Sequence, residues 1–302
     1  MERKSCARLT IFLFPRAGDL WLSVLRIGLG TQIIFFCLSL RHDWNQLLAG
    51  TGGGLISRQL AERMLSSETD FVPRLGWLVA ATKSMGLHED AALSLAWILL
   101  LAAGVLLLVG LWARLAAISA WVLHLAAVKS SGFFSYGVDN FLTIGLFFLM
   151  LSPLPGRLSL DACLRGARPR DPRLIGFFRR ALQLHLCIIY FFGGLTKCLG
   201  SGWWDGSNLW RALTRPHFNM IGTETLVGWS AFFPAAGILI CLLEICYPLL
   251  IWPRQTRLLS LCFICLMHFM IGLTMGMYLF AVIAIILNVA AFAPGLDEQE
   301  RR

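Results

Sequence analysis

Four ionisable residues stand within or at the ends of long apolar segments, where a charge needs a partner or a purpose. Arg26 and Glu244 lie inside otherwise apolar segments, Lys197 lies near the end of another, and His268 lies midway along a fourth. A charged side chain at the centre of a bilayer costs about 2.5–3.5 kcal/mol on insertion scales. A lysine removed from water can act as a general base, and a histidine can orient or accept a proton. These residue types suggest proton-transfer chemistry.

Each of these residues also has a structural interpretation that the sequence leaves open. Arg26 and Glu244 are expected at similar depths and carry opposite charges, so we predict that they form a buried ion pair. That pair would either fix helix packing or serve proton or substrate movement. Lys197 can instead extend its ammonium group to the membrane surface. His268 can instead be a packing residue.

The composition identifies the elements that must position these groups. The chain has 302 residues, of which 57% are hydrophobic and 14% charged, with a mean hydropathy of +0.71. Soluble domains average about 45–50% apolar and about 25% charged residues. The composition excludes a soluble enzyme, a disordered chain and a fibrous protein.

Apolar stretches of about 20 residues predict helices that cross a bilayer. We predict an all-α fold, a polytopic integral membrane helix bundle of about eight transmembrane helices. Interfacial or re-entrant helices are expected on its outer side, in the stretches 41–90 and 202–228. The predicted spans are 20–40, 91–111, 115–129, 133–152, 181–199, 229–252 and two within 258–296, where Gly272 and Gly276 bracket the expected turn.

The basic residues indicate orientation and argue against a nucleic-acid partner. The net charge is +9, but the 26 Lys and Arg residues gather in loops beside apolar segments. With eight spans and the N-terminus in the cytoplasm, most of these residues fall on the cytoplasmic side. We therefore expect a multi-pass membrane protein with both termini cytoplasmic. Among the nine cysteines, Cys262 and Cys265 lie one helical turn apart but have no matching pair elsewhere in the sequence, so no metal site is expected.

Further polar residues are predicted on the same outer side as Lys197. Lys129 ends one predicted span and Asp139 lies near the start of the next. Lys129 can be an interfacial lysine, and Asp139 can cap its helix or pair with a lysine. Together with Lys197 and His268 they indicate an outward-opening polar cavity, without naming its chemistry.

The segment that begins at Tyr190 resembles a membrane-family signature. An aromatic residue, Gly, Lys, Gly, Trp and Gly are met in order by Tyr190, Gly194, Lys197, Gly200, Trp203 and Gly206. The chain resembles the HTTM domain, which is shared with vitamin K-dependent gamma-glutamyl carboxylase. VLRIGLG, LSPLPGRLSLDACLR, LEICYPLLI and LMHFMIGLTMGMYLF resemble further family elements in the same order. The resemblance covers residues 20–295, between an interfacial segment, 1–19, and a polar tail, 296–302.

The resemblance implies a chemistry for the predicted cavity. In the carboxylase, a carbon–carbon lyase, the lysine at the Lys197 position deprotonates vitamin K hydroquinone. Oxygenation then yields a strong base that removes a glutamate γ-proton before carbon dioxide adds. The histidine matched by His268 belongs to the same cavity, to which we also assign Lys129, Asp139, Tyr190 and Trp203. The implied cofactor is reduced vitamin K or a menaquinol-like naphthoquinol.

Two departures set this chain apart from the carboxylase. Gly132 stands where that enzyme has a histidine that assists the hydroquinone. The enzyme also carries a large lumenal domain that engages its protein substrate, whereas this chain ends at Arg302. Many bacterial-type family members consist of the membrane domain alone, which suggests a bacterial inner membrane. Both departures question the carboxylation of a protein.

Three classes of function therefore remain open. The chain can be a quinol-dependent enzyme that uses Lys197, a transporter or lipid-binding protein, or a non-catalytic membrane subunit. The expected partners are membrane lipid, a quinol and a peptide or small-molecule substrate. An inverted repeat would favour transport, and none is evident in the sequence.

Overall fold

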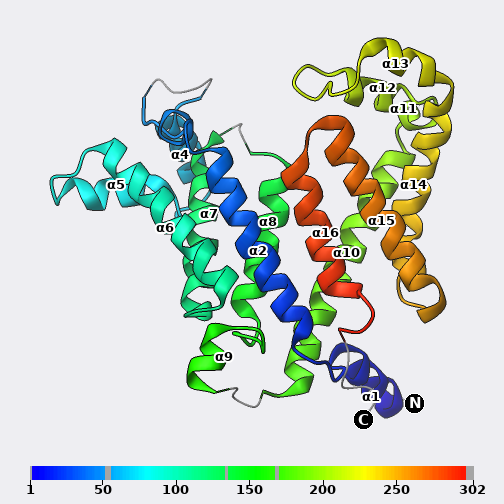
Figure 1. Ribbon diagram of the computed structural model, residues 1–302, viewed down its shortest axis with the longest axis horizontal. Helices are drawn as coiled ribbons and strands as arrows, with labels where there is room; N and C mark the ends of the chain where they lie inside the picture. The colour runs from blue at the N-terminus through cyan, green and yellow to red at the C-terminus, as the bar shows by residue number, and fades with distance from the viewer. Residues whose placement is uncertain (1, 52–55, 133–134, 167–169, 297–302) are drawn as a thin grey trace. The chain divides into compact units, whose positions relative to one another are not determined.

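The computed structural model describes residues 2–51, 56–132, 135–166 and 170–296, and all regular secondary structure in these residues is helical (Figure 1). The chain divides into two compact units. Unit A is Leu22–Pro169, and unit B combines Met1–Trp21 with Arg170–Arg302. The all-α class predicted from the sequence is confirmed.

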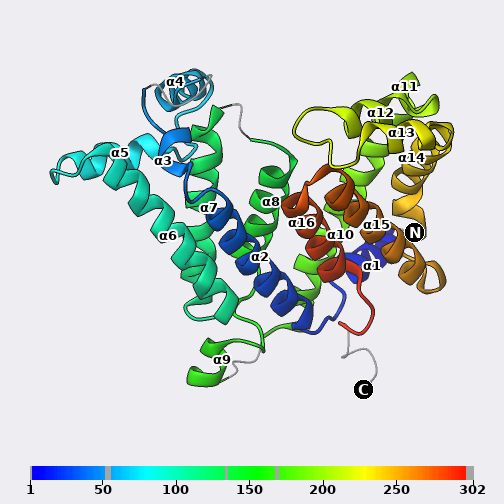
Figure 2. The same cartoon turned by 45° about the horizontal axis from the view of Figure 1, so that its top comes forward.

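Unit A contains three long helices that follow one another along the chain and pack in that order, α6 on α7 and α7 on α8. Figures 1 and 2 show α4 at one end of these helices and α9 at the other. Its elements are α2 (Leu20–Ser39), α3 (Trp44–Leu47), α4 (Arg58–Glu68), α5 (Leu75–Lys83), α6 (Glu89–Val109), α7 (Ala113–Ser130), α8 (Gly137–Leu151) and α9 (Leu160–Arg165).

Unit B is built around the packing of α10 on α14 and of α15 on α16. Three short helices, α11 to α13, gather at the end of α14 where that helix begins (Figure 1). Its elements are α1 (Glu2–Leu13), α10 (Pro172–Cys198), α11 (Ser201–Trp204), α12 (Ser207–Thr214), α13 (Thr223–Trp229), a 3-10 turn (Ser230–Phe232), α14 (Phe233–Leu250), α15 (Arg254–Met275) and α16 (Tyr278–Phe292).

The described residues contain five helices that are long and apolar enough to cross a membrane. They are α2, α6, α10, α15 and the combined segment Thr223–Leu250. Helices α7, α8 and α16 occupy the other predicted positions, and α8 and α16 are 15 residues long. Together with the extent of the apolar helices, this arrangement is that of a multi-pass integral membrane protein.

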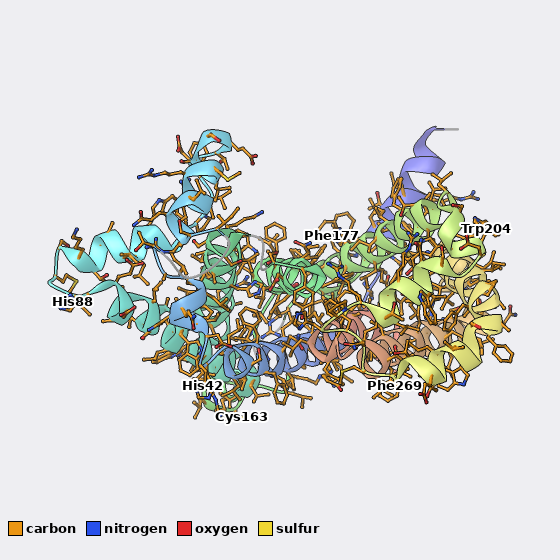
Figure 3. The ribbon with its side chains drawn as sticks, turned by 90° about the horizontal axis from the view of Figure 1, so that it is seen from above. His42, His88, Cys163, Phe177, Trp204 and Phe269 are labelled. Carbon is orange, nitrogen blue, oxygen red and sulfur yellow. The ribbon has the colours of Figure 1, made fainter. Side chains whose placement is uncertain are left out.

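Large apolar side chains are exposed along the helices of unit B, as expected where lipid replaces water. Those on α14 and α15 are Leu239, Leu242, Leu249, Leu250, Leu258, Leu259, Phe263, Leu266, Phe269, Met270 and Leu273. Figure 3 shows Phe269 and Trp204 at the outer edge of this unit. Soluble monomers rarely expose apolar patches of this extent.

The structure corrects two predicted boundaries. Gly276, at φ 69°, ends α15 and divides 258–296 into two helices, but Gly272 lies inside α15 and not at the turn. A Cβ at Gly272 would lie 2.9 Å from Ala281 Cβ, so this glycine serves close packing against α16. Helix α10 begins at Pro172, nine residues before the predicted span, because Asp171 caps it by accepting from Arg173 N.

The N-terminal segment, predicted to be interfacial, packs against α10 through aromatic contacts. Phe14 stacks on Phe177 with ring centroids 4.8 Å apart. The Arg180 guanidinium lies 4.5 Å from the Phe12 ring and 4.7 Å from the Trp252 ring, and its Nε donates to Phe12 O. These contacts attach α1 to the long helices of unit B.

Arg58, a buried arginine, organises the end of unit A where α4 lies. Arg58, on α4, donates to Leu48 O, to Glu62 and to Glu89, with ion-pair distances of 3.2 and 2.8 Å to the two carboxylates. Glu62 also accepts from Ser130 Oγ at 2.7 Å. The network links α4 to the starts of α5 and α6 and to the end of α7.

Arg26 is fully buried in unit A, and its partners are backbone carbonyls. Its Nη1 donates to Leu107 O and, at 2.9 Å, to Leu108 O, and its Nη2 donates to Leu158 O. The last carbonyls of a helix have no partner within the helix. Arg26 therefore caps the end of α6 and attaches it to the chain that leads into α9.

Arg26→Met keeps the length of this side chain but removes its donors, so buried carbonyls lose their partners. We expect a loss of about 3 kcal/mol in the free energy of unfolding, because hydrogen bonds to charged groups contribute about 1.5–3 kcal/mol each. Thermal unfolding in detergent measures the change. The matched control is Arg63→Met, at an exposed position on α4. Equal stability of the two variants would contradict the capping role.

Candidate functional site

Polar side chains from four packed helices lie in the interior of unit B. They are Tyr190 and Lys197 on α10, Glu244 and Tyr247 on α14, His268 on α15 and Asn288 on α16. In a bilayer such groups must satisfy one another, because no water is available to them. They form an ion pair and a hydrogen-bond chain.

The ion pair joins Lys197 to Glu244. Lys197 Nζ lies 2.5 Å from Glu244 Oε2, and the two side chains are 26% and 9% exposed. Lys197 Nζ also lies 5.6 Å from the centre of the Trp203 ring, within the range of a cation–π interaction. Lys197 therefore carries its charge between a carboxylate and an aromatic face.

This arrangement corrects the predicted pairing of Arg26 with Glu244. Glu244 pairs with Lys197 within unit B, while Arg26 donates to carbonyls within unit A. The prediction rested only on the expected depths of Arg26 and Glu244 in the membrane, which are similar. Depth does not specify which helices are neighbours, and Lys197 lies on the helix that packs directly against α14.

Two glycines allow α10 to approach α14 at the ion pair. A Cβ at Gly194 would lie 2.6 Å from Ile245 N and 3.0 Å from Glu244 Cβ, so a larger residue would push the helices apart. A Cβ at Gly193 would lie 3.3 Å from Glu244 Oε2 and 3.7 Å from Lys197 Nζ. Small residues at helix contacts permit this approach in membranes. The paired glycines thus bring the backbone of α10 beside the ion pair.

The donor and acceptor of each hydrogen bond in this chain can be assigned by starting from Ala284 O, which can only accept. Asn288 Nδ2 donates to Ala284 O at 2.8 Å, which orients the amide because a carbonyl can only accept. Asn288 Nδ2 then also donates to Tyr190 OH at 2.6 Å, and Tyr247 OH donates to Asn288 Oδ1 at 2.6 Å. Tyr190 OH is left with its own proton to donate to His268 Nε2, 2.8 Å away.

His268 consequently presents an unpaired donor. With Nε2 accepting from Tyr190, a neutral imidazole carries its proton at Nδ1. That nitrogen is buried and has no hydrogen-bond partner among the described residues. The Phe280 ring contacts the imidazole edge to face, with centroids 5.6 Å apart. An unpaired buried donor costs free energy, which a ligand acceptor would recover.

The predicted site residues divide between the two units. Lys197, Glu244 and Trp203 come together around the ion pair, and Tyr190 contacts His268. The other predicted cavity residues, Lys129 and Asp139, lie in unit A.

Asp139 and Lys129 have the local roles that the sequence left open. The Asp139 carboxylate accepts from Tyr136 N at 2.9 Å, which caps α8, and lies 3.8 Å from His124 Nε2. Lys129 is exposed at the end of α7. Gly132 has a φ of 63°, and a Cβ there would contact Ile56 and Ala61 at 3.6–3.7 Å. A side chain at Gly132 would therefore be strained.

Sequence reasoning missed Asn288 and Tyr247. Asn288 is the amide in the long apolar run that closes the chain, and Tyr247 lies in the segment LEICYPLLI. An amide buried in an apolar helix must find partners, so Asn288 itself was the signal. Among the described residues no group of three or more His, Cys, Asp or Glu side chains could hold a metal ion.

The family model of the HTTM domain matches residues 79–294, well over half of the chain. The chain belongs to the HTTM domain family. Comparison with curated proteins and with solved structures found no match. The HTTM match includes both polar groups of unit B, so the ion pair and the hydrogen-bond chain lie within the family's domain.

Replacing one member of the ion pair in this HTTM protein leaves the other charge without its partner. We expect Lys197→Gln and Glu244→Gln each to lower the free energy of unfolding by up to about 3 kcal/mol, less than for a fully buried pair because Lys197 is partly exposed. The double variant should recover at least about 1 kcal/mol of the summed losses. Thermal unfolding of the four proteins measures this coupling.

The matched control combines Lys83→Gln, at an exposed lysine of α5, with Glu244→Gln. Those two effects should add. Additive effects for Lys197 and Glu244 as well would show that the two side chains do not interact.

Proposed function

We propose that this HTTM protein carries out quinol-linked base chemistry at the Lys197–Glu244 pair, in a cavity reached from the outer side of the membrane. The observation that carries the proposal is that the interior of unit B holds both a shielded lysine–carboxylate pair and a buried imidazole that has an unpaired donor. The first can accept a proton from a hydroxyl group. The second can hold an oxygen of the same molecule.

Glu244 gives Lys197 a route to the neutral amine that a base requires. In a medium of low dielectric constant, a proton that moves from Lys197 Nζ to Glu244 Oε2 removes both charges. Lys197 can then accept the proton of a substrate hydroxyl, and its ammonium stabilises the oxyanion that forms. Glu244 is within hydrogen-bond distance of Nζ, so this transfer needs no rearrangement.

The surrounding residues suit a flat aromatic diol. Trp203 offers an aromatic face beside Lys197, and His268 Nδ1 offers a donor to an oxygen. Reduced vitamin K or a menaquinol-like naphthoquinol would supply the acidic hydroxyl, and dioxygen would accept the electrons that its oxidation releases. Tyr190 holds the His268 imidazole with Nε2 as the acceptor, which keeps the Nδ1 proton available.

We also propose the topology that this access requires. The membrane domain, 20–295, crosses the membrane eight times, both termini are cytoplasmic, and α3–α5 and α11–α13 lie on the outer side of a bacterial inner membrane. The peptide or small-molecule substrate would approach from that side. Labelling of the exposed Cys163 with a membrane-impermeant maleimide tests the orientation, because Cys163 should be inaccessible in sealed cells. Labelling of Cys163 from outside would show that the protein has the opposite orientation in the membrane.

A binding function without catalysis is the second candidate. It is favoured by the completeness of the ion pair, because a lysine already paired with a carboxylate can serve helix packing or the binding of an amphiphile alone. The two candidates differ in whether the Lys197 proton must move.

Lys197→Arg separates them, because arginine keeps the positive charge but is not deprotonated in proteins. We expect quinol-dependent turnover, followed as quinol oxidation in lipid nanodiscs, to fall by about 100-fold or more. Quinol binding, measured by quenching of tryptophan fluorescence, should persist. The matched control Lys83→Arg should keep wild-type turnover.

An arginine variant with wild-type turnover would exclude Lys197 as the base. Wild-type protein that binds the quinol without turning it over would favour the binding function.

A further inference from the structure

Contacts between α10 and α14 follow a regular ladder with antiparallel order. Tyr190 meets Tyr247, with ring centroids 4.5 Å apart. Gly194, one turn later on α10, meets Ile245, two residues earlier on α14. Beyond the end of α10, the backbone of Trp203 lies against Gly237. From Gly194 to Trp203 the chain advances nine residues, while the contacting position on α14 moves back eight, from Ile245 to Gly237, so the two segments run antiparallel.

Cys198 and Cys241 lie between these two backbone contacts, Gly194 with Ile245 and Trp203 with Gly237. Cys198 is four residues after Gly194, and Cys241 is four residues before Ile245, so both cysteines lie on the faces that meet. Their thiol groups are close enough to interact electrostatically. Both cysteines are in the free form. Two points of backbone contact bracket them, which keeps the helices close at this level.

The two cysteines differ in access. Cys241 is 1% exposed, whereas Cys198 is partly exposed at the last residue of α10. Trp204 Nε1 donates to Cys198 O at 2.8 Å, which holds this end of the helix in place.

We propose that Cys198 and Cys241 form a redox-active thiol pair that closes a disulfide between α10 and α14. The oxidant is a small organic disulfide. The Cys198 thiolate attacks one sulfur of that disulfide, forms a mixed disulfide and releases one thiolate. Cys241 gives up its proton to that thiolate and attacks the Cys198 sulfur, which releases the second thiolate. The oxidant gains two electrons, and the two cysteines lose them.

This inference does not rest on quinol chemistry. Disulfide formation needs sulfurs on facing positions whose Cα atoms are within about 7 Å. Backbone contacts at Gly194 and at Gly237, on either side of the pair, keep the two helices close at this level. Lys197 is next to Cys198 on α10, and Glu244 is three residues after Cys241 on α14. The distance between Lys197 and Glu244 would therefore depend on whether the two cysteines are oxidised or reduced.

The experiment equilibrates purified protein in lipid nanodiscs with mixtures of oxidised and reduced glutathione, then alkylates the remaining thiols. Mass spectrometry of a non-reducing digest should reveal a peptide linking Cys198 to Cys241. Its yield should rise with the oxidised fraction and vanish after dithiothreitol. Cys241→Ser should instead accumulate glutathione on Cys198. Cys198→Ser should leave the buried Cys241 unmodified.

The matched control is Cys262→Ser, which removes an exposed cysteine of α15 and should keep the full yield of linked peptide. Size-exclusion chromatography confirms that each protein remains folded during the titration. Folded wild-type protein with no 198–241 linkage at any glutathione ratio would overturn the proposal. So would a Cys241→Ser variant that carries no glutathione on Cys198.

Discussion

The close approach of α10 to α14 at Gly194 is the constraint on which the site depends. Lipid is as apolar as the helix surfaces, so helices in a membrane associate through close packing and polar contacts and not through a hydrophobic drive. A Cβ at Gly194 would lie within 2.6 Å of Ile245 N, so this position admits only glycine without displacement. The same contact brings Lys197 to Glu244 and lets Tyr190 pack on Tyr247.

The hydrogen-bond chain depends on that packing and adds a direction to it. Asn288 is oriented by the carbonyl of its own helix, and from there each donor is assigned in turn through Tyr190 to His268. A network in which nearly every member has a partner is rigid, and its single unpaired donor stands out. The site therefore combines a fixed imidazole with a lysine–carboxylate ion pair. On that combination rests the proposal that this HTTM protein carries out base chemistry on an amphiphilic hydroxyl compound.

Much of the fold could be predicted from the sequence, because apolar length alone marks a membrane helix. The division of residues 258–296 into two helices also followed from local sequence, although Gly276 alone marks the turn. Residue type singled out Lys197 and His268 as buried groups that need partners. The partners did not. Charge and depth suggested Arg26 for Glu244, whereas the true neighbours follow from lateral packing, which no periodicity encodes. Asn288 was missed because one amide in a long apolar run carries no spacing pattern, and its importance emerges only when three helices meet around it.

The most direct test measures the coupling free energy between Lys197 and Glu244 in proteins with and without Gly194→Ala. An added methyl at this position must separate the helices, so the coupling should fall from at least about 1 kcal/mol to below about 0.3 kcal/mol. Gly228→Ala, where nothing lies within 4 Å of the added Cβ, should leave the coupling unchanged. A coupling that survives Gly194→Ala at its full value would contradict the claim that backbone contact between α10 and α14 creates the site.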